Sequence, residues 1–169
     1  MTMLPIIYDP NPILRTRSEE LDGHVIVSPA MQKLMDDMIE TMYDDDGIGL
    51  AAPQIGKNIR LVVIGKEALK HFTVEKGILD PQKDFVLINP VWHKTSRRTG
   101  WDTEGCLSVP KTYGKVKRYV HIHVEGLDRL GNPIAFQASK YLARVVQHET
   151  DHVNGILFID TARDIYTVE

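Results

Sequence analysis

The sequence contains a single cysteine, no long hydrophobic run and no excess of positive charge, and each of these shortages excludes a class of protein. One cysteine, Cys106, cannot form a disulfide within the chain. No apolar stretch approaches the roughly 20 residues that a membrane-spanning helix needs. The N-terminus also lacks the basic region and apolar run of a signal peptide. These features predict a water-soluble, cytoplasmic protein without membrane contact.

The composition is that of an ordinary globular protein. The net charge is −3, and no cluster of lysine and arginine is dense enough to indicate a nucleic acid or an anionic membrane as a partner. The chain has 169 residues, of which 43% are apolar and 25% are charged. This length predicts one domain over residues 1–169.

An amphipathic helix is predicted over residues 29–43. Ser28 is a suitable N-cap, and Pro29 takes the first helical position, where its missing N–H does no harm. The apolar residues that follow recur at steps of three and four: Met31, Leu34, Met35, Met38, Ile39 and Met42. A methionine-rich stripe can form an adaptable binding surface, but we expect this one to face the core. Residues 44–47 then suit a turn.

Strands dominate the middle of the chain, and a second long helix lies near its end. Short β-type runs cover residues 59–64 and 85–89, and residues 119–138 predict a hairpin with its turn at 129–132. The last helix is expected to start near Ser139 and to end at Gly155. The predicted fold class is α+β, with short antiparallel sheets packed around this central helix.

The segment QHETDH, residues 147–152, gives the last helix a candidate metal site. His148 and His152 are one turn apart, about 40° around the helix axis, so their imidazoles project in the same direction. Glu149 lies about 100° from His148, where it can flank a bound ion without binding it. This is the H-E-x-x-H pattern, in which two histidines hold a metal and the glutamate is a general base for water. The same spacing also occurs by coincidence on helix surfaces.

A catalytic metal usually takes three protein ligands, and the sequence offers two sources for the third. Downstream, only Asp160, Asp164 and Glu169 are available, and Asp160 would complete a small zinc metallopeptidase. Upstream, EGCLSVP at residues 104–110 contains Cys106, whose thiolate would suit Fe(II) or Zn(II) and would make the centre sensitive to oxidation. A lone cysteine is otherwise often a small buried hydrophobe.

A glycine-rich segment, GIGLAAPQIG at residues 47–56, is the third unusual stretch. Its glycines and alanines let a backbone approach a ligand or another chain closely. It does not match a phosphate-binding loop, because no lysine follows the glycines at the required place. Gln54 is its one side chain with both a hydrogen-bond donor and an acceptor.

Together, GIGLAAPQIG, EGCLSVP and QHETDH closely resemble the three signature motifs of the peptide deformylases, in the same order. The resemblance covers residues 46–159, and the helix over 29–43 also fits the family's layout. Family members remove the formyl group from the N-terminal formylmethionine of newly made polypeptides and release formate. The resemblance therefore implies a metal-dependent hydrolase whose partners are N-formylmethionyl nascent peptides.

The resemblance also implies a role for each matching residue. One divalent ion, natively Fe(II) but replaceable by Zn(II), Ni(II) or Co(II), would be bound by Cys106, His148 and His152. Glu149 would be the general base and then the acid, while the Gln54 amide and the Leu107 N–H would stabilise the oxyanion. The substrate peptide would pair with the glycine-rich backbone and place its methionine in an apolar pocket, in contact with Ile48, Gly49, Leu50, Gly105 and Val145.

Two features depart from the family pattern. Many relatives have glycine directly after the S-[VI]-P of the second motif, where this chain has Lys111, so the adjoining loop is expected to differ. Relatives with a long C-terminal helix use it to contact the ribosome. Only 17 residues follow His152 here, a short tail, so ribosome contact by that route is not expected.

Other interpretations of the sequence are open. The chain could be a metal-binding module or an inactive relative, although an intact Glu149 and Gln54 argue against decay, since neither is needed to hold a metal. His121 and His123 could form a second metal pair, but the charged residues around them favour a solvated strand face: Lys117, Arg118 and Glu125. We expect no role for three isolated histidines: His24, His71 and His93.

Overall fold

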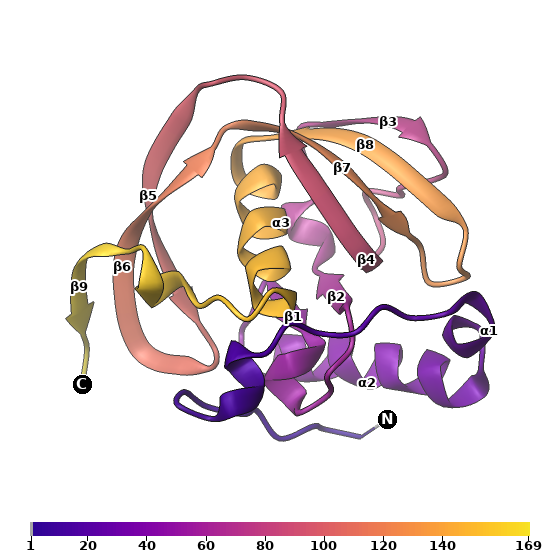
Figure 1. Ribbon diagram of the computed structural model, residues 1–169, viewed down its shortest axis with the longest axis horizontal. Coiled ribbons are helices and arrows are strands. Elements are labelled where there is room, and N and C mark those ends of the chain that lie inside the picture. Colours follow the sequence, from indigo (N-terminus) through magenta and orange to yellow (C-terminus); the bar gives the residue numbers. More distant parts are fainter. Residues whose placement is uncertain (1) are drawn as a thin grey trace.

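Two antiparallel sheets enclose a long helix in the computed structural model, which describes residues 2–169 (Figure 1). The helices are α1 (Gly23–Ile26), α2 (Pro29–Asp44) and α3 (Lys140–Val153), and four short 3-10 helices cover Pro12–Arg15, Ala52–Ile55, Lys66–Ala68 and Phe158–Asp160. The strands are β1 (Gly49–Ala51), β2 (Leu61–Ile64), β3 (Phe72–Lys76), β4 (Phe85–Lys94), β5 (Thr99–Cys106), β6 (Val109–Tyr119), β7 (His121–Leu127), β8 (Pro133–Ser139) and β9 (Arg163–Thr167). The predicted α+β class is confirmed.

Helix α2 begins where the sequence predicts it. The Ser28 hydroxyl accepts a hydrogen bond from the Met31 N–H at 3.3 Å, and Pro29 occupies the first helical turn. Three methionines of the stripe are fully buried: Met35, Met38 and Met42. The other three apolar side chains are partly buried and pack against the same cluster: Met31, Leu34 and Ile39. The stripe therefore faces the core, as expected, and is not an exposed binding surface.

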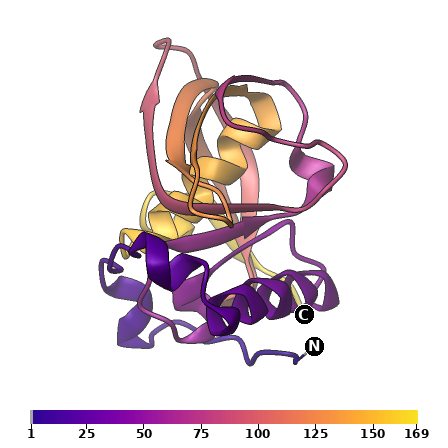
Figure 2. The same ribbon diagram turned by 90° about the vertical axis from the view of Figure 1, so that its right-hand side faces the viewer.

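The larger sheet has the strand order β1-β2-β4-β7-β8-β3, and its paired strands are antiparallel. Successive side chains of a strand point to opposite faces. Val62 and Ile64 of β2 accordingly pack in the same cluster as α3, whereas Leu61 and Val63 pack with the methionines of α2. Strand β2 is thus buried on both faces, and Figure 2 shows α2 below this part of the sheet and α3 above it.

The smaller sheet has the strand order β5-β6-β9, and the sequence analysis predicted none of its three strands. β5 and β6 pair over most of their length and meet in a tight turn after Cys106, which lies opposite Val109. Few residues of β5 and β6 are buried, so these strands lack the alternating apolar pattern that marks a strand in a sequence. The buried positions are Glu104 of β5 and alternate residues near the end of β6: Gly114, Val116 and Arg118.

The remaining predicted strands are confirmed with shifted ends. The hairpin over 119–138 is β7 and β8, paired from His121↔Ser139 to Leu127↔Pro133. Strand β4 continues past the predicted 85–89 to Lys94, because its second half pairs with β7. Within the described residues, no helix is both long enough and apolar enough to cross a membrane.

Helix α3 is fixed differently at its two ends. Ser139 takes the predicted N-cap position, but its hydroxyl donates to the His71 carbonyl at 3.4 Å and makes no capping bond. At the other end, the buried Arg60 donates to the Val153 carbonyl and to Asn154 Oδ1, both at 2.9 Å. A cation at this end also interacts favourably with the partial negative charge of the last helical carbonyls. Arg60 therefore connects the start of β2 to the helix that carries the two histidines.

Replacing Arg60 with alanine should lower the free energy of unfolding by about 2–3 kcal/mol, because two charge-assisted hydrogen bonds at a buried helix end are lost. Urea unfolding followed by circular dichroism measures this change. Arg17→Ala, which removes an exposed arginine from the neighbouring segment, is the matched control and should change stability by less than about 0.5 kcal/mol. Equal stability of the two variants would contradict the role given to Arg60.

Candidate metal centre

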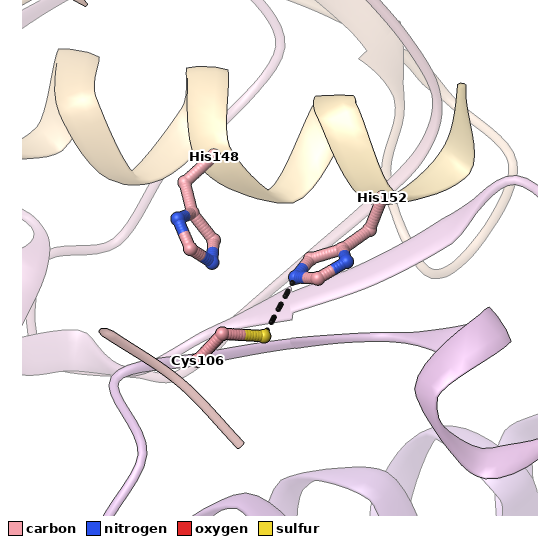
Figure 3. A group of neighbouring side chains, drawn as sticks. All are labelled: Cys106, His148 and His152. Atoms are coloured by element: carbon pink, nitrogen blue, oxygen red, sulfur yellow. Dashed lines mark hydrogen bonds between the residues drawn. The ribbon is translucent and has the colours of Figure 1, made fainter. Parts of the chain in front are cut away.

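Three side chains from two distant segments of the sequence meet at one point between the sheets. Cys106 ends β5, and His148 and His152 lie on successive turns of α3 (Figure 3). One ligand atom from each residue, the cysteine sulfur and a ring nitrogen of each histidine, lies within 4.8 Å of the other two. Among the described residues, no other group of three histidine, cysteine or acidic side chains has this geometry. The structure therefore brings together the three ligands predicted from the sequence.

The spacing of these atoms fits a single divalent metal ion. Cys106 Sγ and His152 Nε2 are 3.4 Å apart. Two ligands of one tetrahedral zinc ion, with a Zn–S bond of about 2.3 Å and a Zn–N bond of about 2.0 Å, are separated by roughly 3.5 Å. The His148 and His152 rings lie 5.0 Å apart at 74°, so their nitrogens converge while the ring faces do not stack. One thiolate and two imidazoles form a donor set suited to Fe(II) or Zn(II).

A buried carboxylate orients the first of these histidines. Glu104 Oε1 lies 2.7 Å from His148 Nδ1, which leaves Nε2 as the nitrogen for a metal. Arg118 forms two hydrogen bonds to the same carboxylate, at 2.9 and 2.8 Å, and Arg144 Nη1 donates to it at 2.7 Å. Arg118 also donates to Asp151 on α3, at 2.6 Å. Carboxylates in this position fix the tautomer and the orientation of metal-binding histidines.

The charges of this network shift the pKa values of its members. Burial alone would raise the pKa of Glu104, but the hydrogen bonds from Arg118 and His148 hold it well below its usual range. Burial alone would likewise lower the pKa of His148, but the neighbouring Cys106 and Glu104 raise it to about 10. Burial and the adjacent His148 lower the pKa of His152 well below its usual range. Without a metal, a proton is therefore held on His148, and a metal ion would compete with it.

Gln54 is fixed beside the cysteine by three hydrogen bonds. Its side-chain Oε1 accepts from the Ala51 N–H at 2.9 Å. Its Nε2 donates to Cys106 Sγ at 3.4 Å and to the hydroxyl of the buried Ser108 at 3.2 Å. These contacts direct the amide N–H groups toward Cys106 and Ser108. Gln54 is 2% exposed, so the orientation is protected from solvent.

Glu149 is buried next to the centre and has an unusually basic carboxylate. Burial raises the pKa of Glu149 to about 7. Its Oε2 atom has no hydrogen-bond partner among the described residues. Gly49 of β1 packs directly against it, because a Cβ atom on Gly49 would lie 2.6 Å from Glu149 Oε1. The carboxylate is therefore held in a space that only a glycine at position 49 leaves free.

A cavity of about 570 Å³ opens onto this centre. Most of the predicted substrate-binding residues line it: Ile48, Gly49, Gly105 and Val145. Leu107, Gln54 and Glu149 line it as well. Leu50 does not, because its side chain is fully buried in the cluster around α2. Only the backbone of Leu50 is therefore placed to contact a peptide.

The structure decides between alternatives that the sequence left open. Asp160 does not join the histidines, because its carboxylate is paired with Arg15 and accepts from the Leu157 N–H. The pair His121 and His123 does not form a solvated face, since His123 is buried and lies 3.0 Å from Glu125. His93 is not isolated, because its ring lies 4.9 Å from that of His123.

Sequence reasoning missed the residues that support the centre: Glu104, Ser108, Arg118, Arg144 and Asp151. For two of these residues, the spacing in the sequence contains a signal. Arg144 lies four residues before His148 and therefore on the same face of the helix. Arg118 is in phase with the buried Gly114 and Val116, which places a charge on the inner face of β6. No local pattern distinguishes Glu104, because its partners come from β6 and α3.

Comparison with known proteins gives consistent matches. The family described as Polypeptide deformylase matches residues 3–167. Peptide deformylase 2 of Vibrio vulnificus (strain CMCP6) is 43% identical over 164 residues, which cover 95% of this chain and 86% of that protein. The crystal structure of a peptide deformylase from Legionella pneumophila has a TM-score of 0.82 and 36% identity, covering 96% of this chain and 88% of that one. The Met-Ala-Ser-bound crystal structure of a class I type b peptide deformylase from Acinetobacter baumannii has a TM-score of 0.81 and 29% identity. The match covers 95% of this chain and 98% of that one.

Replacing Glu104 with glutamine should weaken metal binding by about 10–100-fold, because the neutral amide no longer holds His148 as the carboxylate does. Competition between the protein and a chelator for Ni(II) measures the affinity. Asp102→Asn changes an exposed carboxylate on the same strand and should leave the affinity unchanged. An affinity for Ni(II) that is the same in both variants would show that Glu104 does not support the centre.

Proposed function

The chain belongs to the polypeptide deformylase family, and from that premise we propose how its residues carry out the family's reaction. It is a hydrolase that removes the N-formyl group from the N-terminal formylmethionine of newly synthesised polypeptides and releases formate. One observation supports the assignment of its active site more than any other. The sulfur and nitrogen atoms of Cys106, His148 and His152 converge next to the buried Glu149, and Cys106, His148 and Glu149 line the cavity described above.

The proposed cofactor is one divalent metal ion, held by the cysteine sulfur and the two histidine nitrogens. Fe(II) is the proposed native ion, and Zn(II), Ni(II) or Co(II) could occupy the same ligands. When bound, such an ion supplies Lewis acidity, which polarises a carbonyl oxygen and makes water acidic enough to be a nucleophile near neutral pH. The hydrogen bond from Gln54 to Cys106 Sγ would tune the thiolate in this role.

Glu149 is proposed to move the proton. Its carboxylate would accept a proton from the attacking water and deliver it to the nitrogen of methionine as the C–N bond to the formyl carbon breaks. A general base works best when its pKa lies close to the working pH. Burial places the pKa of Glu149 at about 7, which suits both the acceptance and the release of the proton.

Gln54 and the Leu107 N–H are proposed to stabilise the oxygen that becomes negative when the formyl carbon turns tetrahedral. The three hydrogen bonds of the Gln54 amide fix its orientation before substrate arrives. The N–H that contacts Cys106 Sγ would be shared with this oxygen. One donor oriented in advance is typically worth about 3 kcal/mol. Leu107 follows Cys106 in the tight turn and lines the same cavity.

The substrate peptide is proposed to bind in an extended form along β1. This strand is at the edge of the larger sheet and pairs only with β2 within that sheet, so its outer side can accept another strand. The methionine side chain would then occupy the part of the cavity lined by Val145. The Met-Ala-Ser peptide bound to the similar Acinetobacter baumannii protein supports this substrate class.

Nascent formylated polypeptides are the proposed partners, and the cytoplasm, where translation starts, is the proposed location. We propose no contact between this chain and the ribosome.

Formate release from formyl-Met-Ala-Ser tests this function. Protein purified without oxygen and loaded with Ni(II) should release formate over many turnovers per chain. Glu149→Ala should keep the nickel and lose on the order of 10²–10⁴-fold in rate, because the proton shuttle is gone. Glu125→Ala, an exposed glutamate on β7, is the control and should match the unmodified protein.

Two outcomes would contradict the proposal. No formate from folded, nickel-loaded protein would reject the function itself. Formate release by Glu149→Ala at the unmodified rate would remove Glu149 from the mechanism.

A methyl group at position 49 should disturb the same carboxylate. Gly49→Ala would place its Cβ 2.6 Å from Glu149 Oε1, so the buried glutamate must move. We expect nickel to stay bound and the kcat of formate release to fall at least tenfold, since small displacements of a catalytic group are costly. Gly23→Ala is the matched control, because its Cβ would have no neighbour within 4 Å. An unchanged kcat in Gly49→Ala would show that the contact does not position Glu149.

A further inference from the structure

We propose that Tyr113, held in place by Tyr166 of β9, contacts a side chain that follows formylmethionine and so determines which nascent peptides are processed best. The inference rests on the proposed function and concerns the substrate class of the same site. It assigns a large apolar side chain, aromatic above all, as the preferred one. It also makes the C-terminal strand part of the substrate site, although Tyr166 does not line the cavity.

The position of the Tyr113 ring is fixed on one side by the residue next to a metal ligand. Tyr113 of β6 pairs with Gly105 of β5, and Gly105 directly precedes Cys106. A Cβ atom on Gly105 would lie 2.7 Å from Tyr113 Cε1 and 2.9 Å from Cδ1. The ring therefore lies against the bare backbone of Gly105, and a side chain at position 105 would push it away.

Tyr166 covers the same ring from the neighbouring strand. The two tyrosines are register partners between β6 and β9, and their rings stack with centroids 5.8 Å apart and planes at 30°. Next to this pair, the Val168 N–H donates to the Lys111 carbonyl at 2.8 Å, which continues the attachment of the chain end to β6. Figure 1 shows β9 alongside β6, at the outer side of the smaller sheet. Gly105 and Tyr166 together leave the Tyr113 ring little freedom to rotate.

The free part of the Tyr113 ring faces the substrate cavity. Tyr113 lines that cavity and remains 37% exposed, so it is available to a ligand. The proposed methionine pocket lies at Val145, on α3. Tyr113 belongs to the other wall of the cavity, which β5 and β6 form. Neighbouring side chains of an extended peptide point to opposite sides. When methionine faces α3, the wall formed by β5 and β6 is therefore left for the residue directly after it.

A fixed tyrosine ring favours a particular chemistry. It offers a flat apolar face at little further cost in conformational entropy, because its two side-chain angles are already set by its neighbours. Aromatic pairs gain about 0.5–1.5 kcal/mol beyond simple burial of area. A peptide with phenylalanine at the contacting position should therefore react with a kcat/KM about 3–10-fold higher than the same peptide with alanine.

Three peptides test the inference on nickel-loaded protein: formyl-Met-Ala-Ser, formyl-Met-Phe-Ser and formyl-Met-Ala-Phe. The quantity compared is the ratio of kcat/KM between each phenylalanine peptide and formyl-Met-Ala-Ser. The unmodified protein should show a ratio of about 3–10 for formyl-Met-Phe-Ser and a ratio near 1 for formyl-Met-Ala-Phe. The ratio should fall to about 1 in Tyr113→Ser and in Tyr166→Ser, and Tyr113→Phe should retain it.

A double variant and a control separate positioning from a general weakening of β9. If Tyr166 acts through Tyr113, adding Tyr166→Ser to Tyr113→Ser should not change the ratio further. Arg163→Ala also alters β9, by removing the cation–π contact of Arg163 with Trp101 at 4.8 Å, but Arg163 lies outside the cavity. It should keep the ratio of the unmodified protein. Nickel content and melting temperature show which variants are folded, and leucine variants replace any serine variant that is not.

The results that overturn the inference differ from those that overturn the function. Absence of formate from all three peptides rejects the proposed function. Formate from all three with ratios near 1 in the unmodified protein, or with a ratio that Tyr113→Ser does not change, rejects the role of Tyr113. A ratio lost in Tyr113→Ser but kept in Tyr166→Ser, or lost equally in Arg163→Ala, rejects the role of Tyr166.

Discussion

The carboxylate of Glu104 lies buried where β5, β6 and α3 meet, and the geometry of the metal centre depends on it. A buried charge is costly unless charged and hydrogen-bonding groups surround it. Here two arginines and a histidine surround it, with Arg118 from β6 and both Arg144 and His148 from α3. The bonds that compensate this charge also fix the distance between the strand that ends at Cys106 and the helix that carries both histidines. Removal of one partner would leave the buried carboxylate with fewer compensating bonds, so the three partners support it together.

Apolar contacts along its length and hydrogen bonds at its C-terminal end also hold α3 in place. Side chains of α3 pack with both β2 and the hairpin strands β7 and β8, while α2 covers the other face of β2. Arg60 bonds the C-terminal end of α3 to the segment before β2. Gly49 of β1 then approaches Glu149 so closely that no side chain fits between them. A rigid helix between two sheets thus places a general base, two metal ligands and an open strand edge around one cavity, as hydrolysis of a formamide at a peptide N-terminus requires.

Much of the fold and the ligand set could be predicted because the signals are local. The stripe of α2, its Ser28-Pro29 start, the β7–β8 hairpin and the one-turn spacing of His148 and His152 each lie within a short window. The third metal ligand, Cys106, was identified from the resemblance of its motif to that of the deformylases. Strands β5, β6 and β9 escaped prediction because few of their residues are buried, so no alternating apolar pattern marks them. Glu104 escaped because its role arises from partners on other elements. The burial of His123 was not expected, because its pairing with Glu125 is not visible in the sequence. The alternative third ligand, Asp160, is paired with Arg15 instead.

X-ray absorption at the nickel edge of the Ni(II)-loaded protein tests the arrangement of the centre most directly. The account predicts one sulfur and two imidazole nitrogens among the nearest neighbours of the nickel, with the sulfur lost in Cys106→Ser. A spectrum without a sulfur neighbour in the unmodified protein would contradict it, because the ion would then be bound without Cys106.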